Sequence, residues 1–66
     1  MQSRTMTLAE WLEWTGRRRD WLAALLGADP ASVSRWASGR QRPGFDTRHH
    51  IHLVTHGMVH LEDSWR

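Results

Sequence analysis

The chain has no cysteine, no lysine and no tyrosine among its 66 residues. Without cysteine, neither a disulfide framework nor a thiolate zinc site can help to hold so short a chain together. No apolar run approaches the roughly 18 residues of a membrane-spanning helix, and the first residues, MQSRTMT, lack the apolar core of a secretory signal peptide. We therefore expect one domain over residues 1–66, in a protein of the cytoplasm, near the lower size limit for folding alone.

The sequence also lacks the patterns that carry catalysis. It has no Gly-rich phosphate loop, no nucleophile elbow and no pair of carboxylates spaced for acid–base chemistry. A chain of this length offers little room for a substrate pocket. We therefore expect a binding protein without a cofactor rather than an enzyme.

The positive charge is unevenly distributed, although the formal net charge is only +2. Residues 1–45 carry seven arginines against four acidic residues, whereas residues 46–66 carry two against three. The arginines concentrate at residues 17–19 (RRR) and 40–42 (RQR), on either side of one short segment. A planar guanidinium binds two phosphate oxygens at once, so this pattern favours a nucleic-acid partner. A solvated basic face is the alternative that charge alone leaves open.

Helix start and stop signals follow one another closely along the chain. Thr7 and Glu10 have the spacing of a capping box, and Asp29 followed by Pro30 is typical of an N-cap and a first helical turn. The expected helices run from Leu8 to near Gly16, from about Arg18 to Leu26, from Pro30 to Gly39 and from Phe45 to Thr55, with a last helical turn from Leu61 to Trp65.

Residues 49–62, HHIHLVTHGMVHLE, are ambiguous because they also match two alternating strands around a central His-Gly turn. The alternation is short and helix starts are available just before it, so we favour a fourth helix with Phe45, Ile51 and Val54 facing inward. The predicted fold is therefore all-α, a small bundle of four to five helices. An α+β fold with a C-terminal hairpin is the alternative.

Residues 19–38 have the pattern of a helix-turn-helix, in which two helices are joined by a short turn. Ala23 allows the two helices to approach closely, and Gly27 permits a left-handed turn that a β-carbon would strain. The side chains expected to fill the angle between the helices are Leu22, Leu26, Ala28, Val33 and Trp36. The opposite face of the helix that starts at Pro30 is left with short side chains and one arginine.

That face suits a DNA major groove, which is about 12 Å wide, because short side chains let the backbone approach the bases. Arg35 is expected to reach base edges, best those of guanine, with discrimination of about 1–3 kcal/mol. Ala31 is expected to touch a thymine methyl, and Ser32 and Ser34 to bond bases or phosphate. The predicted phosphate contacts, which set register and affinity rather than sequence, are Arg18, Arg19, Ser38, Arg40 and Arg42.

Three segments, TLAEWLEWTG (7–16), RDWLAALLGADPASVSRWASGRQRP (19–43) and IHLVTHGMVHLEDSW (51–65), carry a family resemblance. They resemble the Cro-type repressors of lambdoid phages and their YdaS-like bacterial relatives, within the xenobiotic-response-element class of helix-turn-helix proteins. The resemblance implies a λ-repressor-like homodimer that binds a palindromic operator and represses transcription, often of its own promoter, in a bacterial or phage-infected cell. By position, it implies that the base-reading residues are Pro30, Ala31, Ser34 and Arg35, and that the phosphate contacts are Arg19, Arg40 and Arg42.

Two places depart from the family pattern. Pro30 and Ala31 stand where relatives often carry Gln or Ser, which leaves more of the base readout to Arg35. Arg48 stands where a small core-facing residue is usual, so we expect the fourth helix to be rotated or locally exposed. The family contains both all-helical and mixed α/β C-terminal halves.

A homodimer is also expected on physical grounds, because one module reads too little DNA for high specificity and two half-sites lie about 34 Å apart. The expected dimerisation segment is residues 57–66, with an interface formed by Met58, Val59, Leu61 and Trp65. The alternative is that these side chains close the core of the monomer.

Trp14 and Trp21 fall at the edges of their helices' apolar faces. Packing at the edge of the core is favoured for both, and contact with a second protein partner is the alternative. Such a contact would suit an alternative function on the same scaffold, a protein-interaction factor such as an antitoxin or a phage inhibitor of a host protein.

Four histidines, His49, His52, His56 and His60, recur at steps of three and four residues. This spacing resembles that of zinc ligands, but a helix end is expected before the last of them and no cysteine accompanies them. We therefore expect no metal site. A response of DNA binding to histidine protonation is a milder hypothesis.

Overall fold

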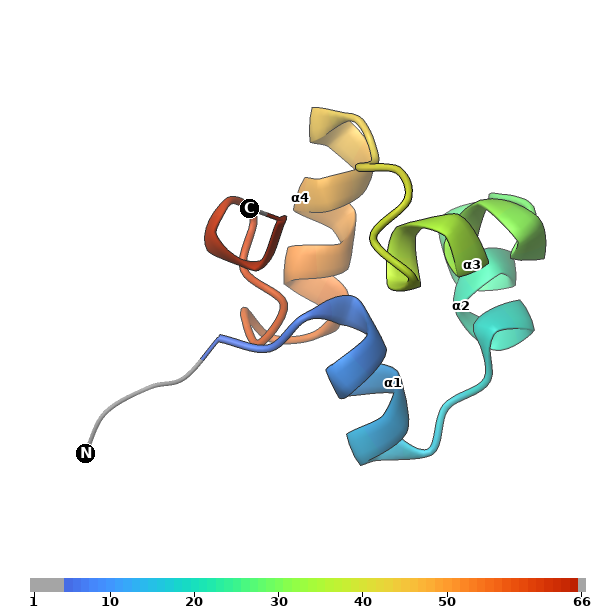
Figure 1. Ribbon diagram of the computed structural model, residues 1–66, viewed down its shortest axis with the longest axis horizontal. Coiled ribbons are helices and arrows are strands. Elements are labelled where there is room, and N and C mark those ends of the chain that lie inside the picture. Colours follow the sequence, from blue (N-terminus) through green and yellow to red (C-terminus); the bar gives the residue numbers. More distant parts are fainter. Residues whose placement is uncertain (1–4, 66) are drawn as a thin grey trace.

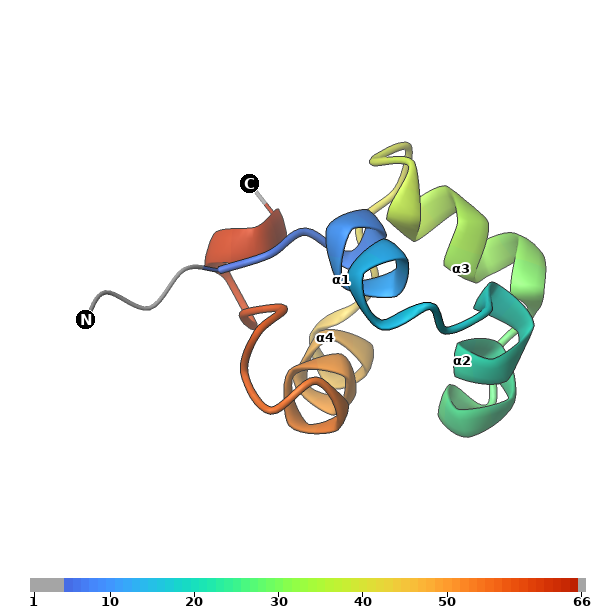
Figure 2. The same ribbon diagram turned by 90° about the horizontal axis from the view of Figure 1, so that it is seen from below.

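The computed structural model describes residues 5–65, which form four short α-helices and one 3₁₀ turn. The elements are α1 (Leu8–Thr15), α2 (Arg19–Leu26), α3 (Pro30–Ala37), α4 (Phe45–Val54) and the 3₁₀ turn η1 (Asp63–Trp65). Figures 1 and 2 show α2 and α3 packed together at one end of the molecule, α1 and α4 in the middle, and η1 at the other end. No strand occurs among residues 5–65, so the all-α prediction is confirmed and the C-terminal hairpin is disfavoured. None of the helices in this range is long and apolar enough to cross a bilayer.

Local chemistry marks several helix ends at the residues that the sequence predicts. The hydroxyl of Thr7 accepts a hydrogen bond from the Glu10 N–H at 3.2 Å, and the Glu10 carboxylate accepts one from the Thr7 N–H at 2.9 Å, so the predicted capping box is present. Gly27 follows α2 in the left-handed conformation, with φ of 70°, as predicted. Asp29 stands at the N-cap of α3, as predicted, although its side chain makes no capping hydrogen bond. Pro30 in the first turn favours the start of α3 through its fixed φ angle.

The buried core draws apolar side chains from all four helices and from the chain after α4. Its members are Leu8, Trp11, Leu12, Leu22, Ala23, Val33, Ile51 and Val59. Burying a side chain as large as Leu or Ile stabilises the fold by about 1.5–3 kcal/mol. These few residues therefore supply most of the apolar stabilisation that so short a chain has.

Phe45 does not join this core, contrary to the prediction, because it begins α4 and is 56% exposed. The buried Ile51 lies six positions further along the chain, which places the two side chains about 120° apart around the helix. Arg48 is half-buried beside it. Its Nη1 donates to the Pro43 carbonyl at 3.4 Å, and its guanidinium lies 5.9 Å from the centre of the Phe45 ring.

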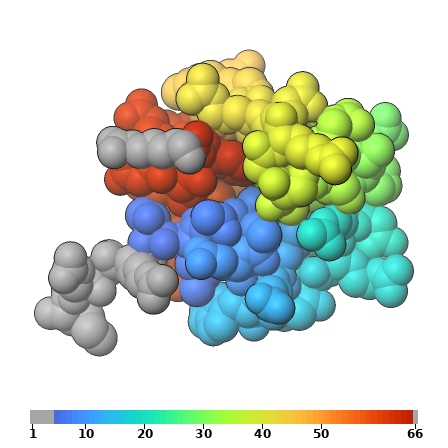
Figure 3. Space-filling model, in the orientation of Figure 1, coloured from blue at the N-terminus to red at the C-terminus, as the bar shows by residue number. Residues whose placement is uncertain are grey.

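The chain after α4 folds back onto the core through a buried threonine. The hydroxyl of Thr55, which is 1% exposed, donates to the Ile51 carbonyl at 2.8 Å and accepts from the Val59 N–H at 3.1 Å. The Met6 N–H donates to the Met58 carbonyl at 2.7 Å, so this segment also lies against the chain before α1. Figure 3 shows the C-terminal residues, in red, between α1, in blue, and the residues that follow α3, in yellow. Val59 has no exposed area, so its prediction as a dimer-interface residue is wrong: it belongs to the core.

Candidate nucleic-acid interface

Helices α2 and α3 make the most extensive helix–helix contact in the structure. Leu22, Ala23 and Val33 are at most 1% exposed between them, and the small side chain of Ala23 permits the close approach that the sequence predicts. Leu26 and Trp36 are half-buried and pack against the same cluster. The turn of residues 27–29 connects the helices, and α3 lies at the surface of the molecule (Figure 2).

The outward face of α3 carries the predicted base-reading residues. Pro30, Ala31, Ser34 and Arg35 are exposed, and Ser32 is half-buried. Val33 is fully buried. Because an α-helix has 3.6 residues per turn, Ala31 and Arg35, two positions before and after Val33, lie on the opposite, exposed face. A helix face with mostly short side chains is therefore exposed to a partner.

Beside this face lies a shallow hollow, here called the arginine hollow. It encloses about 340 Å³ and is lined by Arg19, Ser34, Arg35, Ser38 and Arg40. No carboxylate lines it, so the positive charges of its three arginines all attract an anionic ligand. Arg19 comes from the first turn of α2, where free backbone N–H groups also favour an anion. The hollow suits a polyanion.

The side chain of Arg35 is held in place by two hydrogen bonds. Its Nε donates to Oε1 of Gln41 at 3.0 Å and its Nη2 donates to the Ser32 hydroxyl at 3.1 Å. The carbonyl of Arg35 accepts from the Ser38 hydroxyl at 3.1 Å and from the N–H groups of Arg40 and Gln41 at 3.0 and 3.3 Å. A guanidinium has five N–H donors, so Arg35 is oriented and still has donors left for a ligand.

Sequence reasoning missed Gln41, because an amide between two arginines carries no periodic signal. Its role depends on the chain bending back after α3, so that residues six positions apart meet. This bend also directs Arg40 into the arginine hollow.

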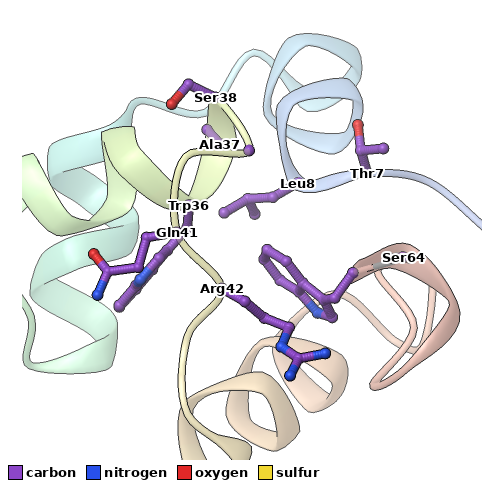
Figure 4. A pocket seen from close by; sticks show the side chains of 10 residues that line it. Thr7, Leu8, Trp36, Ala37, Ser38, Gln41, Arg42 and Ser64 are labelled. Atoms are coloured by element: carbon purple, nitrogen blue, oxygen red, sulfur yellow. The ribbon is translucent and has the colours of Figure 1, made fainter.

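Two predicted phosphate contacts lie outside the arginine hollow. Arg42 lines a different hollow of about 290 Å³ between the end of α3, the start of α1 and η1. Figure 4 shows Gln41 and Arg42 pointing to opposite sides of the chain between α3 and α4. Arg18 lies in a neighbouring hollow with Arg19, and its Nε is 3.2 Å from a carboxylate oxygen of Asp20. An exposed ion pair of this kind contributes little to stability.

The predicted dimer segment is largely folded onto the monomer. Met58, Leu61 and Trp65 are half-buried, and Met58 and Trp65 pack against the core. These three side chains keep some exposed area, whereas Val59 keeps none. The alternative reading, closure of the monomer core, therefore holds fully for Val59 and in part for Met58 and Trp65.

Two of the histidines shape this C-terminal segment. Nδ1 of His52 accepts the Leu61 N–H at 3.2 Å, and Nδ1 of His60 accepts the N–H groups of Glu62 and Asp63 at 3.1 Å each. The two imidazole rings meet edge to face, 5.4 Å apart. Within residues 5–65, no group of three His, Asp or Glu side chains is placed to hold a metal ion.

Comparison with known proteins adds no assignment to this geometry. No protein-family model, curated protein or solved structure matches the chain. The resemblance to Cro-type repressors stays a prediction from the sequence motifs.

Proposed function

We propose that this protein binds double-stranded DNA sequence-specifically, with α2 and α3 acting as a helix-turn-helix and α3 lying in the major groove. The observation that carries the proposal is the continuity between the open face of α3 and the arginine hollow. Ala31, Ser34 and Arg35 are exposed on a helix that Val33 anchors, and Arg19 and Arg40 stand beside that face. Three guanidiniums without a carboxylate among them favour a polyanion over an uncharged partner.

The residues divide between base reading and phosphate binding. Arg35 reads a guanine edge, because its guanidinium is held at the helix surface by Gln41 and Ser32. Arg19 and Arg40, which line the arginine hollow together, bind phosphates, which fixes register and supplies affinity. Ala31 and Ser34 let the helix backbone come close to the bases.

The active form is a homodimer on a palindromic operator, because one α3 of eight residues spans too few base pairs for high specificity. The remaining exposed area of Met58, Leu61 and Trp65 is the proposed contact between the two copies. Bound at a promoter, its own among them, such a dimer represses transcription by occupying the site. The protein then acts in the cytoplasm, on the nucleoid.

The test is in vitro selection from a random duplex library with the full chain, followed by titration of the selected DNA. We expect an inverted repeat with half-sites about one helical turn apart. Arg35→Ala should weaken binding to the selected site by about 5- to 150-fold, the equivalent of 1–3 kcal/mol, and relax preference at one base pair of each half-site. Arg17→Ala, an exposed arginine outside the arginine hollow, is the matched control and should bind nearly as well as the parent.

Recovery of no enriched motif, or equal losses from Arg35→Ala and Arg17→Ala, would contradict the proposal. Enrichment of a single half-site without a repeat would contradict the dimer but keep the reading helix.

A further inference from the structure

Another hollow lies away from α3, where the end of α1, the start of α2 and the end of α4 meet. It encloses about 430 Å³, and we name it the tryptophan groove. Its lining consists of Trp11, Trp14, Thr15, Arg17, Trp21, Val54 and His56. No residue of α3 or of the arginine hollow lines it.

Exposed indole rings dominate this groove. Trp14 is 63% exposed and Trp21 is 37% exposed, and Trp21 stacks on the buried Trp11 with 6.4 Å between ring centres. Leu25, which is 47% exposed, lies one turn along α2 from Trp21 on the same side of the helix. Packing at the core edge thus accounts for Trp21 but not for Trp14. Clustered exposed indoles mark surfaces that become buried against a partner.

The charge of the groove identifies what the partner must offer. The guanidinium of Arg17 lies over the Trp21 ring at 4.5 Å from its centre. No carboxylate lines the groove, and among residues 5–65 no acidic side chain forms an ion pair with Arg17. A guanidinium stacked on a ring keeps its N–H donors at its edge. The groove is therefore complementary to an apolar side chain with a carboxylate beside it.

We propose that the tryptophan groove docks a second, different protein, which inserts a leucine or aromatic side chain between Trp14 and Trp21 and places an Asp or Glu against Arg17. A second copy of this chain fits poorly, because a two-fold contact pairs the groove with an identical groove, which has no lining carboxylate to place against Arg17. A membrane surface fits poorly as well, because a concave hollow receives protruding side chains better than a flat lipid layer. The docking does not rest on DNA binding.

The test uses the full chain labelled with nitrogen-15 and a matched pair of synthetic helical peptides. Both peptides present leucine and phenylalanine at positions i and i+4, and they differ in carrying glutamates or lysines beside these residues. The readout is the indole N–H signals of the five tryptophans. We expect the acidic peptide to shift the Trp14 and Trp21 signals saturably, to leave those of Trp36 and Trp65 in place, and to bind about tenfold tighter than the basic peptide.

Variants separate the groove from a general apolar effect. Trp14→Ala should weaken the acidic peptide about tenfold, and Arg17→Glu should reverse the preference so that the basic peptide binds better. Phe45→Ala removes an aromatic ring of similar exposure outside the groove and should change neither affinity. Circular dichroism confirms that each variant is folded, and Arg17→Glu alone decides the question if Trp14→Ala unfolds.

Three results would overturn the proposal. One is no saturable binding of either peptide, or equal binding of both. Another is a shift of the Trp14 and Trp21 signals by phosphatidylglycerol vesicles and not by the peptide, which would assign the groove to a membrane. The last is a concentration-dependent shift of these signals without peptide, which would assign it to self-association. Since the assay contains no DNA, its failure leaves the proposed DNA binding untouched.

Discussion

The side-chain oxygen of Gln41 accepts a hydrogen bond from Nε of Arg35 at 3.0 Å, although the two residues are six positions apart in the chain. The Ser32 hydroxyl accepts a second hydrogen bond from the same guanidinium. In the proposed complex Gln41 is thus a positioning residue, which acts on DNA through Arg35 and orders that side chain before binding.

Gln41→Ala should lower affinity for the selected DNA by about 2- to 12-fold, the range of one net hydrogen bond. Fluorescence anisotropy with a labelled duplex measures the change. In a double-mutant cycle, Gln41→Ala should cost almost nothing once Arg35→Ala is present, because its effect passes through that side chain. A full additional loss in the double variant would show that Gln41 acts independently of Arg35.

Arg40→Ala should reduce the dependence of affinity on salt. Each phosphate contact contributes about 0.9 to the slope of log affinity against log salt concentration, so the slope should become shallower by about that amount while the preferred bases stay the same. Titrations at several salt concentrations measure it, with Arg17→Ala as control. A changed base preference with an unchanged salt slope would show that Arg40 contacts base edges rather than the phosphate backbone.

Val33→Ala should destabilise the fold by about 2 kcal/mol, because it removes two buried methyl groups from a residue with no exposed area and leaves a cavity. Ser34→Ala, on the exposed side of the same helix, should stay within about 0.5 kcal/mol of the parent. Urea unfolding followed by circular dichroism compares the two. Equal stabilities would mean that α3 is not anchored through Val33.

Gly27→Ala should cost about 1–2 kcal/mol of stability. Its φ of 70° strains any residue with a β-carbon, and the space around the site is empty, so the backbone alone accounts for the cost. Gly44 has an ordinary φ of −64° and equally open surroundings, so Gly44→Ala should change stability by less than about 0.5 kcal/mol. Thermal unfolding of the two variants side by side makes the comparison.

Thr55→Val should cost about 1–3 kcal/mol, because it leaves the buried Val59 N–H without its acceptor. Thr55→Ser keeps the hydroxyl and loses one methyl group, about 1 kcal/mol. Hydrogen exchange at the Val59 amide gives the specific readout: exchange should accelerate in Thr55→Val beyond the loss of global stability and not in Thr55→Ser. Matching acceleration in both variants would contradict the role of the hydroxyl.

Most helix boundaries could be predicted from the sequence because their causes are local. A capping box needs only Thr7 and Glu10 three residues apart, and the left-handed end of α2 needs only Gly27. The two faces of α3 follow in the same way, since residues one apart on a helix point in different directions whatever surrounds them. Val33 is buried and Arg35 exposed as the pattern predicts.

Contacts between distant segments were decided by the tertiary structure. Phe45 is apolar and sits in a helix, yet it lies past the edge of the core, whereas Val59 enters the core because Thr55 turns the chain after α4. The pairing of Gln41 with Arg35 and the exposure of Trp14 depend in the same way on how the elements meet. Sequence alone determined where this chain is helical and which side of α3 carries short side chains, because those properties arise within one or two turns. The tertiary structure decided which side chains are buried and which arginines lie side by side. Both depend on how the few apolar residues of a 66-residue chain pack, and packing involves all the elements at once.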